Sequence, residues 1–248
     1  MDRDAPLKAG MQTFPWWELF AIHLGWGPRA ESLDACAARL ARFVSLLEPL
    51  SPHLAGLRSA WGANGQLIRF DVTGDACGPM FLRAKSGFQF QGSLEFDPGH
   101  QLPLHILAGA EQSLGSVFLP ELHNTNNVTL SAVVKDVAGV DAPIIAGLKP
   151  MLLAAIEAWE PDCATINAHH YRQPPLFSGA RSFATGCWAI YLASALARNI
   201  APPPDCIAES TPAGDLLMMA TDGLFSHEDP ALRATAEAIQ AAVAPLNL

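Results

Sequence analysis

The chain has 248 residues, half of them hydrophobic and only 16% charged, which excludes an intrinsically disordered protein and allows a sizeable core. The net charge of −9 disfavours direct binding of nucleic acid, because an acidic surface repels phosphate. The five cysteines form no CxxC pair, and no apolar run has the length of a signal peptide or membrane span, so we expect a cytoplasmic protein with free thiols.

The N-terminal part of the chain predicts a strand followed by a helix. Residues 14–26 are rich in aromatic side chains with partial alternation, which is typical of a strand, and Gly27-Pro28 ends it. Residues 31–47 carry apolar side chains at spacings of three and four, which predicts a helix, and Pro49 lies just beyond its end. The apolar stripe consists of Leu33, Ala37, Leu40, Val44 and Leu47.

The middle of the chain, residues 66–134, predicts several strands of a mostly antiparallel sheet. Runs such as QLIRFDV, GFQFQGSLEF, LPLHILA and NVTLSAVV are rich in β-branched and aromatic residues and are separated by turn-forming residues. Gln89, Gln91 and Ser93 alternate with apolar neighbours. One face of this sheet is therefore expected to be polar and solvated.

The C-terminal part returns to a mixture of helices and strands. Residues 150–159 have helical spacing, and Pro150 fits the first turn of such a helix. Residues 172–186 have the composition of a loop, and residues 188–192 and 216–221 are apolar strands. Asp229-Pro230 predicts a helix start, with Asp229 as the cap.

Strands that cluster in the middle of the chain, without regular alternation with helices, favour an α+β fold over a doubly wound one. We predict a mostly antiparallel central sheet with about three main helices packed on it. No stretch has the composition of a linker, so residues 1–248 are expected to form a single domain without an internal boundary.

Catalytic signatures are missing from the sequence. It contains no GxSxG, P-loop, HExxH or EF-hand pattern, and no GxGxxG after a strand. Cys187 beside Trp188 is better explained as a small core residue than as a nucleophile. We therefore predict no catalytic residue and no cofactor.

Two histidine-containing segments invite a metal-site interpretation. His169-His170 lies near Asp162, but adjacent residues point in different directions, so a loop or an interface is the preferred interpretation. His227 precedes Glu228 and Asp229, a spacing that suits a helix cap better than a ligand set. No metal site is predicted.

The last fifty residues have a lopsided charge, with seven acidic residues and one base, Arg233. Such a surface would attract a basic protein surface. The simpler interpretation, that the acidic residues only keep the protein soluble, stays open. The acidic residues are Asp205, Glu209, Asp215, Asp222, Glu228, Asp229 and Glu237.

Residues 26–47, WGPRAESLDACAARLARFVSLL, resemble the N-terminal signature of the immunity protein 52 family of bacterial polymorphic toxin systems. AWEPD at residues 158–162, CWAIYL at residues 187–192 and the segment 214–246 resemble later motifs of that family, in the same order. Residues 65–141 carry no recognisable motif of the family. The matching residues of the first motif are Trp26, Gly27, Pro28, Arg29, Glu31, Ser32, Cys36, Ala37, Arg39, Leu40 and Phe43.

The resemblance implies a cognate inhibitor of a secreted antibacterial toxin, delivered by type VI or related secretion and similar to nucleases of the restriction-endonuclease fold. A nuclease needs a positively charged groove, which an acidic protein surface can meet. We therefore expect contact with the toxin, and no direct contact with nucleic acid or membrane; the oligomeric state stays open. The acidic residues expected to bind the toxin are Glu160, Asp162, Asp222, Glu228 and Asp229.

Two other functions remain as alternatives. An adaptor or chaperone for a secreted effector would share the acidity and the lack of catalytic motifs. A metal-dependent hydrolase would use His169, His170 and nearby acidic residues.

Overall fold

The computed structural model describes residues 18–50, 58–61, 67–70, 78–84, 86–97, 100–111, 126–134, 142–170, 187–223, 225–226 and 228–246. Within these ranges eleven strands form one sheet, in which every paired strand is antiparallel to its neighbour. The strand order is β10-β11-β9-β8-β1-β7-β6-β5-β2-β3, and β4 pairs with β5. The predicted α+β fold with an antiparallel sheet is confirmed, whereas the single-domain organisation stays a prediction.

The α-helices lie toward the two ends of the chain, and the middle of the chain forms strands and short turns. The strands are β1 (Glu18–Trp26), β2 (Arg58–Trp61), β3 (Leu67–Phe70), β4 (Leu82–Arg83), β5 (Phe88–Asp97), β6 (His100–Ala108), β7 (Asn126–Val134), β8 (Cys163–His170), β9 (Cys187–Leu192), β10 (Ile207–Ser210) and β11 (Leu216–Met219). The helices are α2 (Leu33–Leu47), α4 (Ala142–Trp159), the short α5 (Ser194–Ala197) and α6 (Pro230–Val243). Short 3-10 turns follow α2 at Glu48–Leu50, precede β4 at Gly78–Met80 and follow α6 at Ala244–Leu246.

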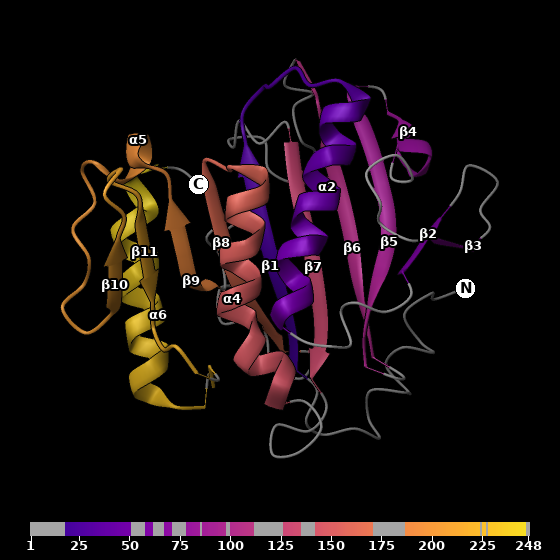
Figure 1. Cartoon of the computed structure of the whole chain (residues 1–248). Coiled ribbons are helices and arrows are strands. Elements are labelled where there is room, and N and C mark those ends of the chain that lie inside the picture. The colour runs from indigo at the N-terminus through magenta and orange to yellow at the C-terminus, as the bar shows by residue number, and fades with distance from the viewer. Residues whose placement is uncertain are drawn as a thin grey trace, which may run out of the picture.

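Helices α2 and α4 lie side by side against the middle of the sheet, whereas α6 packs on β9 and β11 (Figure 1). Alternate residues of β1 turn into the core under α2 and α4, since Phe20, Ile22, Leu24 and Trp26 are buried and Trp26 stacks on Trp159 of α4. The indole rings are 5.8 Å apart between centroids. The main core therefore lies between the sheet and this pair of helices.

Two helices form where their local sequence signals predict them. The Ser32 side chain accepts a hydrogen bond from the Ala35 amide at the start of α2, and Asp229 caps α6 in the same way. The predicted apolar stripes face the core, where Leu40 and Val44 of α2 and Ile239 of α6 are buried. The start of α6 also confirms the interpretation of Asp229 as a cap.

The predicted start of the helix at Pro150 is wrong. Helix α4 begins two turns earlier, at Ala142, and Pro150 lies inside it. A proline within a helix removes one backbone hydrogen bond, but Leu148 and Met151 on either side are buried in the core, and this packing outweighs the local preference. The end of the helix at Trp159 agrees with the prediction.

Other expectations from the sequence divide between confirmation and correction. Strand β1 confirms the described part of the predicted strand at residues 14–26, and β9 and β11 confirm the two later apolar strands. The alternation in β5 is confirmed in part: Phe90 and Leu94 are buried and Gln91 is exposed, whereas Gln89 and Ser93 are half-buried. Strands β8 and β10 were not predicted, because one is small and polar in composition and the other is exposed. The predicted loop at residues 172–186 lies outside the described residues.

Candidate interaction surface

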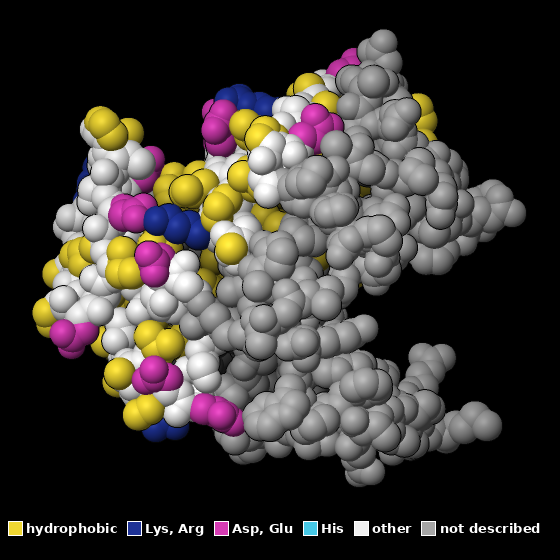
Figure 2. Space-filling model, turned by 60° about the horizontal axis from the view of Figure 1, so that its bottom comes forward, with side chains coloured by type: hydrophobic (Ala, Val, Ile, Leu, Met, Phe, Trp, Pro, Cys, Tyr) yellow, Lys and Arg dark blue, Asp and Glu magenta, His cyan; other side chains and the backbone are white. Residues whose placement is uncertain are grey.

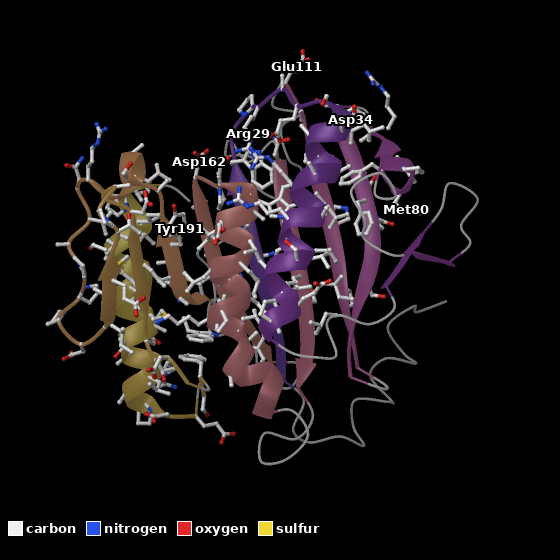
Figure 3. The ribbon with its side chains drawn as sticks, in the orientation of Figure 1. Arg29, Asp34, Met80, Glu111, Asp162 and Tyr191 are labelled. Carbon is white, nitrogen blue, oxygen red and sulfur yellow. The ribbon has the colours of Figure 1, made fainter. Side chains whose placement is uncertain are left out.

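The first two motifs that resemble the family meet at the end of α4, around a cluster that we call the arginine node: Arg29, Glu31, Arg39 and Glu160 (Figure 3 labels Arg29). Arg29 Nη2 donates to the carbonyl of Trp159 at 2.8 Å, and Arg39 Nη1 donates to that of Ala158 at 2.8 Å. The last carbonyls of a helix have no partner within the helix. The two arginines therefore cap α4 from outside it.

Glu31 holds both arginines in place. Arg39 Nε lies 2.7 Å from Glu31 Oε1, and Arg29 Nε lies 3.4 Å from Glu31 Oε2. The Glu31 side chain is only 9% exposed, so the loss of either cation would leave a poorly hydrated carboxylate. Burial, with the charge of Glu31 as a second cause, also raises the pKa of the neighbouring Cys36 thiol to about 11. The thiol is thus protonated at neutral pH and is not activated as a nucleophile.

Glu160 has an unusual backbone conformation for its residue type. It follows the last residue of α4 with a φ of 48°, the left-handed region that glycine normally occupies at this position. Its side chain is 65% exposed, and its Oε2 accepts from Arg39 Nη2 at 2.9 Å. One oxygen of the Glu160 carboxylate is therefore already bound to Arg39 of the arginine node.

Asp162 also forms hydrogen bonds within the fold, through both its side chain and its backbone. Its Oδ2 accepts from the Gly27 amide at 2.9 Å, and its backbone bonds Gly25 on one side and Ala193 on the other. These bonds tie the start of β8 to the end of β1 and to the end of β9. Asp162 thus acts as a structural link among three strands.

The other predicted contact residues have a different setting. Asp222 is exposed beyond the end of β11, and Glu228 is exposed just before α6. Within the described part of the chain, no hydrogen bond or ion pair involves their carboxylates, and the same holds for exposed Asp205. Asp229 differs, because its Oδ1 accepts from the Ala231 and Leu232 amides at 2.8 and 3.3 Å. Asp229 is therefore a helix cap on an exposed residue.

Asp205, Asp222 and Glu228 together form what we call the C-terminal acidic surface. Asp205 comes two residues before Ile207, which pairs with Met219, and Asp222 comes three residues after Met219. Both thus lie at the same end of the β10–β11 hairpin, where the chain passes on to α6. Figure 2 shows acidic side chains scattered among apolar ones over the side of the molecule formed by the C-terminal elements, on the left. Asp205 is not one of the five predicted contact residues, but it belongs to the acidic C-terminal segment that the sequence singles out as able to attract a basic protein surface.

The five predicted contact residues do not form one patch. Asp162 adjoins Ala193, just beyond the end of β9, and β11 runs antiparallel to β9. The chain after β11 therefore lies at the opposite end of the sheet from Asp162; Figure 1 shows the start of α6 at the bottom of the view, and Figure 3 shows Asp162 near the top. Glu160 and Asp162 are at one end, and Asp222, Glu228 and Asp229 are at the other.

The histidine segments give no ligand set among the described residues. The backbone of His169 and His170 lies on β8, paired with β1, so the loop setting that was one of the two expected for this pair is wrong. His227 lies outside the described residues. In the described ranges no three His, Cys, Asp or Glu residues are grouped so as to hold a metal ion. Burial raises the pKa of the Cys187 thiol to about 12, in line with a core position.

None of the helices in the described ranges combines the length and the hydropathy required to cross a membrane. Comparison with known proteins shows that residues 20–246 match the family model of immunity protein 52. No curated protein matches the chain. Among solved structures, T6SS protein PA0821 of Pseudomonas aeruginosa is similar at 11% sequence identity and a TM-score of 0.43, over 88% of this chain and 75% of that one. A similarity this distant carries no argument about function.

Proposed function

The chain belongs to the immunity protein 52 family, and from this premise we propose that it binds a cognate secreted antibacterial toxin in the cytoplasm and neutralises it by protein–protein contact. The family assignment favours a protein that acts by binding over an enzyme. Toxin neutralisation requires a surface of the immunity protein that the fold does not already use.

The C-terminal acidic surface supports this proposal best. Its three carboxylates, on Asp205, Asp222 and Glu228, are exposed and free of the hydrogen bonds and ion pairs of the described fold. Glu160 and Asp162, by contrast, already bind Arg39 and the Gly27 amide. A carboxylate that must leave a partner to bind another gains less than a free one. We therefore assign toxin contact first to the C-terminal acidic surface.

The chemistry of this surface fits a nuclease as the toxin. A nuclease holds its phosphate substrate in a basic groove, and an acidic surface both attracts such a groove and accelerates the encounter. Neutralisation calls for tight binding, on the order of a nanomolar dissociation constant, or about −12 kcal/mol. Exposed carboxylates supply steering and orientation, and buried anchors must supply much of that affinity.

Co-expression tests the proposal. A toxin gene adjacent to this gene is expressed in a susceptible bacterium with and without this chain, and survival and co-purification are scored. We expect the chain to restore survival and to co-purify with the toxin. An adaptor would co-purify without restoring survival. If the cells die and the two proteins do not co-purify, the proposed neutralisation is wrong.

A further inference from the structure

Among the described strands, β10 is the last of the sheet on the side of the C-terminal elements, and the hydrogen bonds of neighbouring residues show which way its backbone groups point. The Thr211 amide donates to the Asp215 carbonyl at 3.0 Å, which makes these two residues a hydrogen-bonded pair. Because such pairs alternate along an antiparallel ladder, Glu209 and Ile207 also direct their backbone groups toward β11. The backbone groups of Ala208 and Ser210 therefore point away from the sheet.

A second hydrogen bond supports this assignment independently. The Ala220 amide donates to the Trp188 carbonyl at 2.8 Å, which directs the even-numbered residues of β11 toward β9. The odd-numbered residues of β11, Leu217 and Met219, must then face β10, opposite Glu209 and Ile207. Both bonds give the same result for β10.

The outward groups of β10 are available to a partner. All four side chains of the strand are exposed, and none of the described residues hydrogen-bonds the backbone of Ala208 or Ser210. The strand lacks proline and lysine, which commonly protect a sheet edge. The strand is short, so its free edge offers an added strand two N–H and two C=O groups, those of Ala208 and Ser210.

The charge around β10 selects its partner. Asp205 lies just before the strand and Glu209 within it; Lys149 Nζ donates to Glu209 Oε1 at 2.6 Å, whereas the exposed Asp205 carboxylate has no hydrogen bond or ion pair among the described residues. Antiparallel pairing of β10 with a second copy of itself, with Ala208 of each copy opposite Ser210 of the other, would place two copies of Glu209 opposite each other, and like charges across strands are destabilising. A basic segment meets no such repulsion.

We propose that β10 accepts an extended, cationic segment of the toxin as an additional edge strand. Main-chain hydrogen bonds to Ala208 and Ser210 hold the segment, and the exposed Ile207 side chain and the exposed carboxylate of Asp205 select its side chains. The proposal rests on the proposed function, because it names the place where the toxin docks.

Amide hydrogen exchange of the full-length chain, alone and with a catalytically inactive form of the toxin encoded beside it, tests the docking mode. In the free chain the amides of Ala208 and Ser210 exchange fast, whereas those of Ile207 and Glu209 are protected by β11. Toxin binding slows exchange at Ala208 and Ser210 by about tenfold or more, since each amide gains a hydrogen bond. Unchanged exchange at both amides in the complex overturns the proposal.

Proline substitution provides the second test. The double variant Ala208→Pro, Ser210→Pro removes only outward N–H groups, which a sheet edge tolerates, and the matched control Ala208→Thr, Ser210→Thr keeps them. We expect the dissociation constant for the inactive toxin to rise about tenfold or more for the proline variant, and less than about threefold for the control. Thermal unfolding checks that both variants are folded.

The outcomes separate the two proposals. If the wild-type chain neither binds nor neutralises the toxin, the proposed function and the docking mode both fail. If the wild-type chain neutralises the toxin but the folded proline variant binds equally well, only the docking at β10 is wrong. Toxin-independent protection of Ala208 and Ser210 that grows with protein concentration would point to self-pairing and would also overturn it.

Discussion

The two ends of the sheet both carry acidic residues, but these residues serve different purposes. At the end of α4, Glu31, Glu160 and Asp162 are bound to arginines or to backbone amides. Between β11 and α6, Asp222 and Glu228 are exposed and free of partners among the described residues. An acidic residue in a family-like motif can therefore serve to hold the fold together. Acidic residues outside the clearest motif keep carboxylates that are free to bind a partner.

The largest effect on stability is expected at the arginine node. Arg39→Ala removes the cation that faces nearly buried Glu31 and uncaps the Ala158 carbonyl, so the free energy of unfolding should fall by about 2–3 kcal/mol. Urea unfolding measures it. The control is Arg42→Ala on the same helix, which breaks an ion pair more than half exposed on both sides and should cost less than about 1 kcal/mol. Equal losses for the two variants would contradict a structural role of the node.

A smaller effect is expected at the start of α6. Asp229→Ala removes the cap of the Ala231 and Leu232 amides and should lower the free energy of unfolding by about 1 kcal/mol. Its neighbour Glu228 makes no such bond with its side chain, so Glu228→Ala should change stability by less than about 0.5 kcal/mol. Thermal unfolding of both variants tests whether Asp229 belongs to the framework despite its position beside the free acidic residues.

The smallest net effect is expected at Glu160, where strain and ion pairing oppose each other. Glu160→Gly relieves the left-handed backbone but loses the contact with Arg39, so stability should stay within about 0.5 kcal/mol of wild type. Glu160→Ala loses the contact and keeps the strain, and should be about 1 kcal/mol less stable than the glycine variant. If alanine proves as stable as glycine here, the left-handed conformation of Glu160 is wrong.

The sequence predicts the parts of the fold whose signals are local. The cap at Ser32, the Asp229-Pro230 step and the apolar stripes each act within a few residues, and α2 and α6 form where they indicate. The start of α4 was mispredicted because Leu148 and Met151 hold the helix together through long-range packing around Pro150.

The candidate site shows the same limit. Arg39 and Arg42 both lie away from the apolar stripe of α2, yet one joins a partly buried cluster and the other an exposed pair. The difference depends on which part of α4 packs opposite each arginine. The spacing of residues along the chain does not reveal how α2 and α4 pack together. Likewise, the sequence could not separate free acidic residues from bound ones, because their partners are distant in the chain, as with Asp162 and Gly27.

The association rate with the inactive toxin, measured at several salt concentrations, tests the central claim most directly. The variant Asp222→Asn, Glu228→Gln is compared with Asp34→Asn, Glu111→Gln, which removes the same charge from exposed positions away from the C-terminal acidic surface (Figure 3). We predict that the first variant associates about tenfold more slowly at low salt, with a weaker salt dependence, while the second stays close to wild type. Equal rates and equal salt dependence for both variants would contradict the assignment of toxin binding to the C-terminal acidic surface.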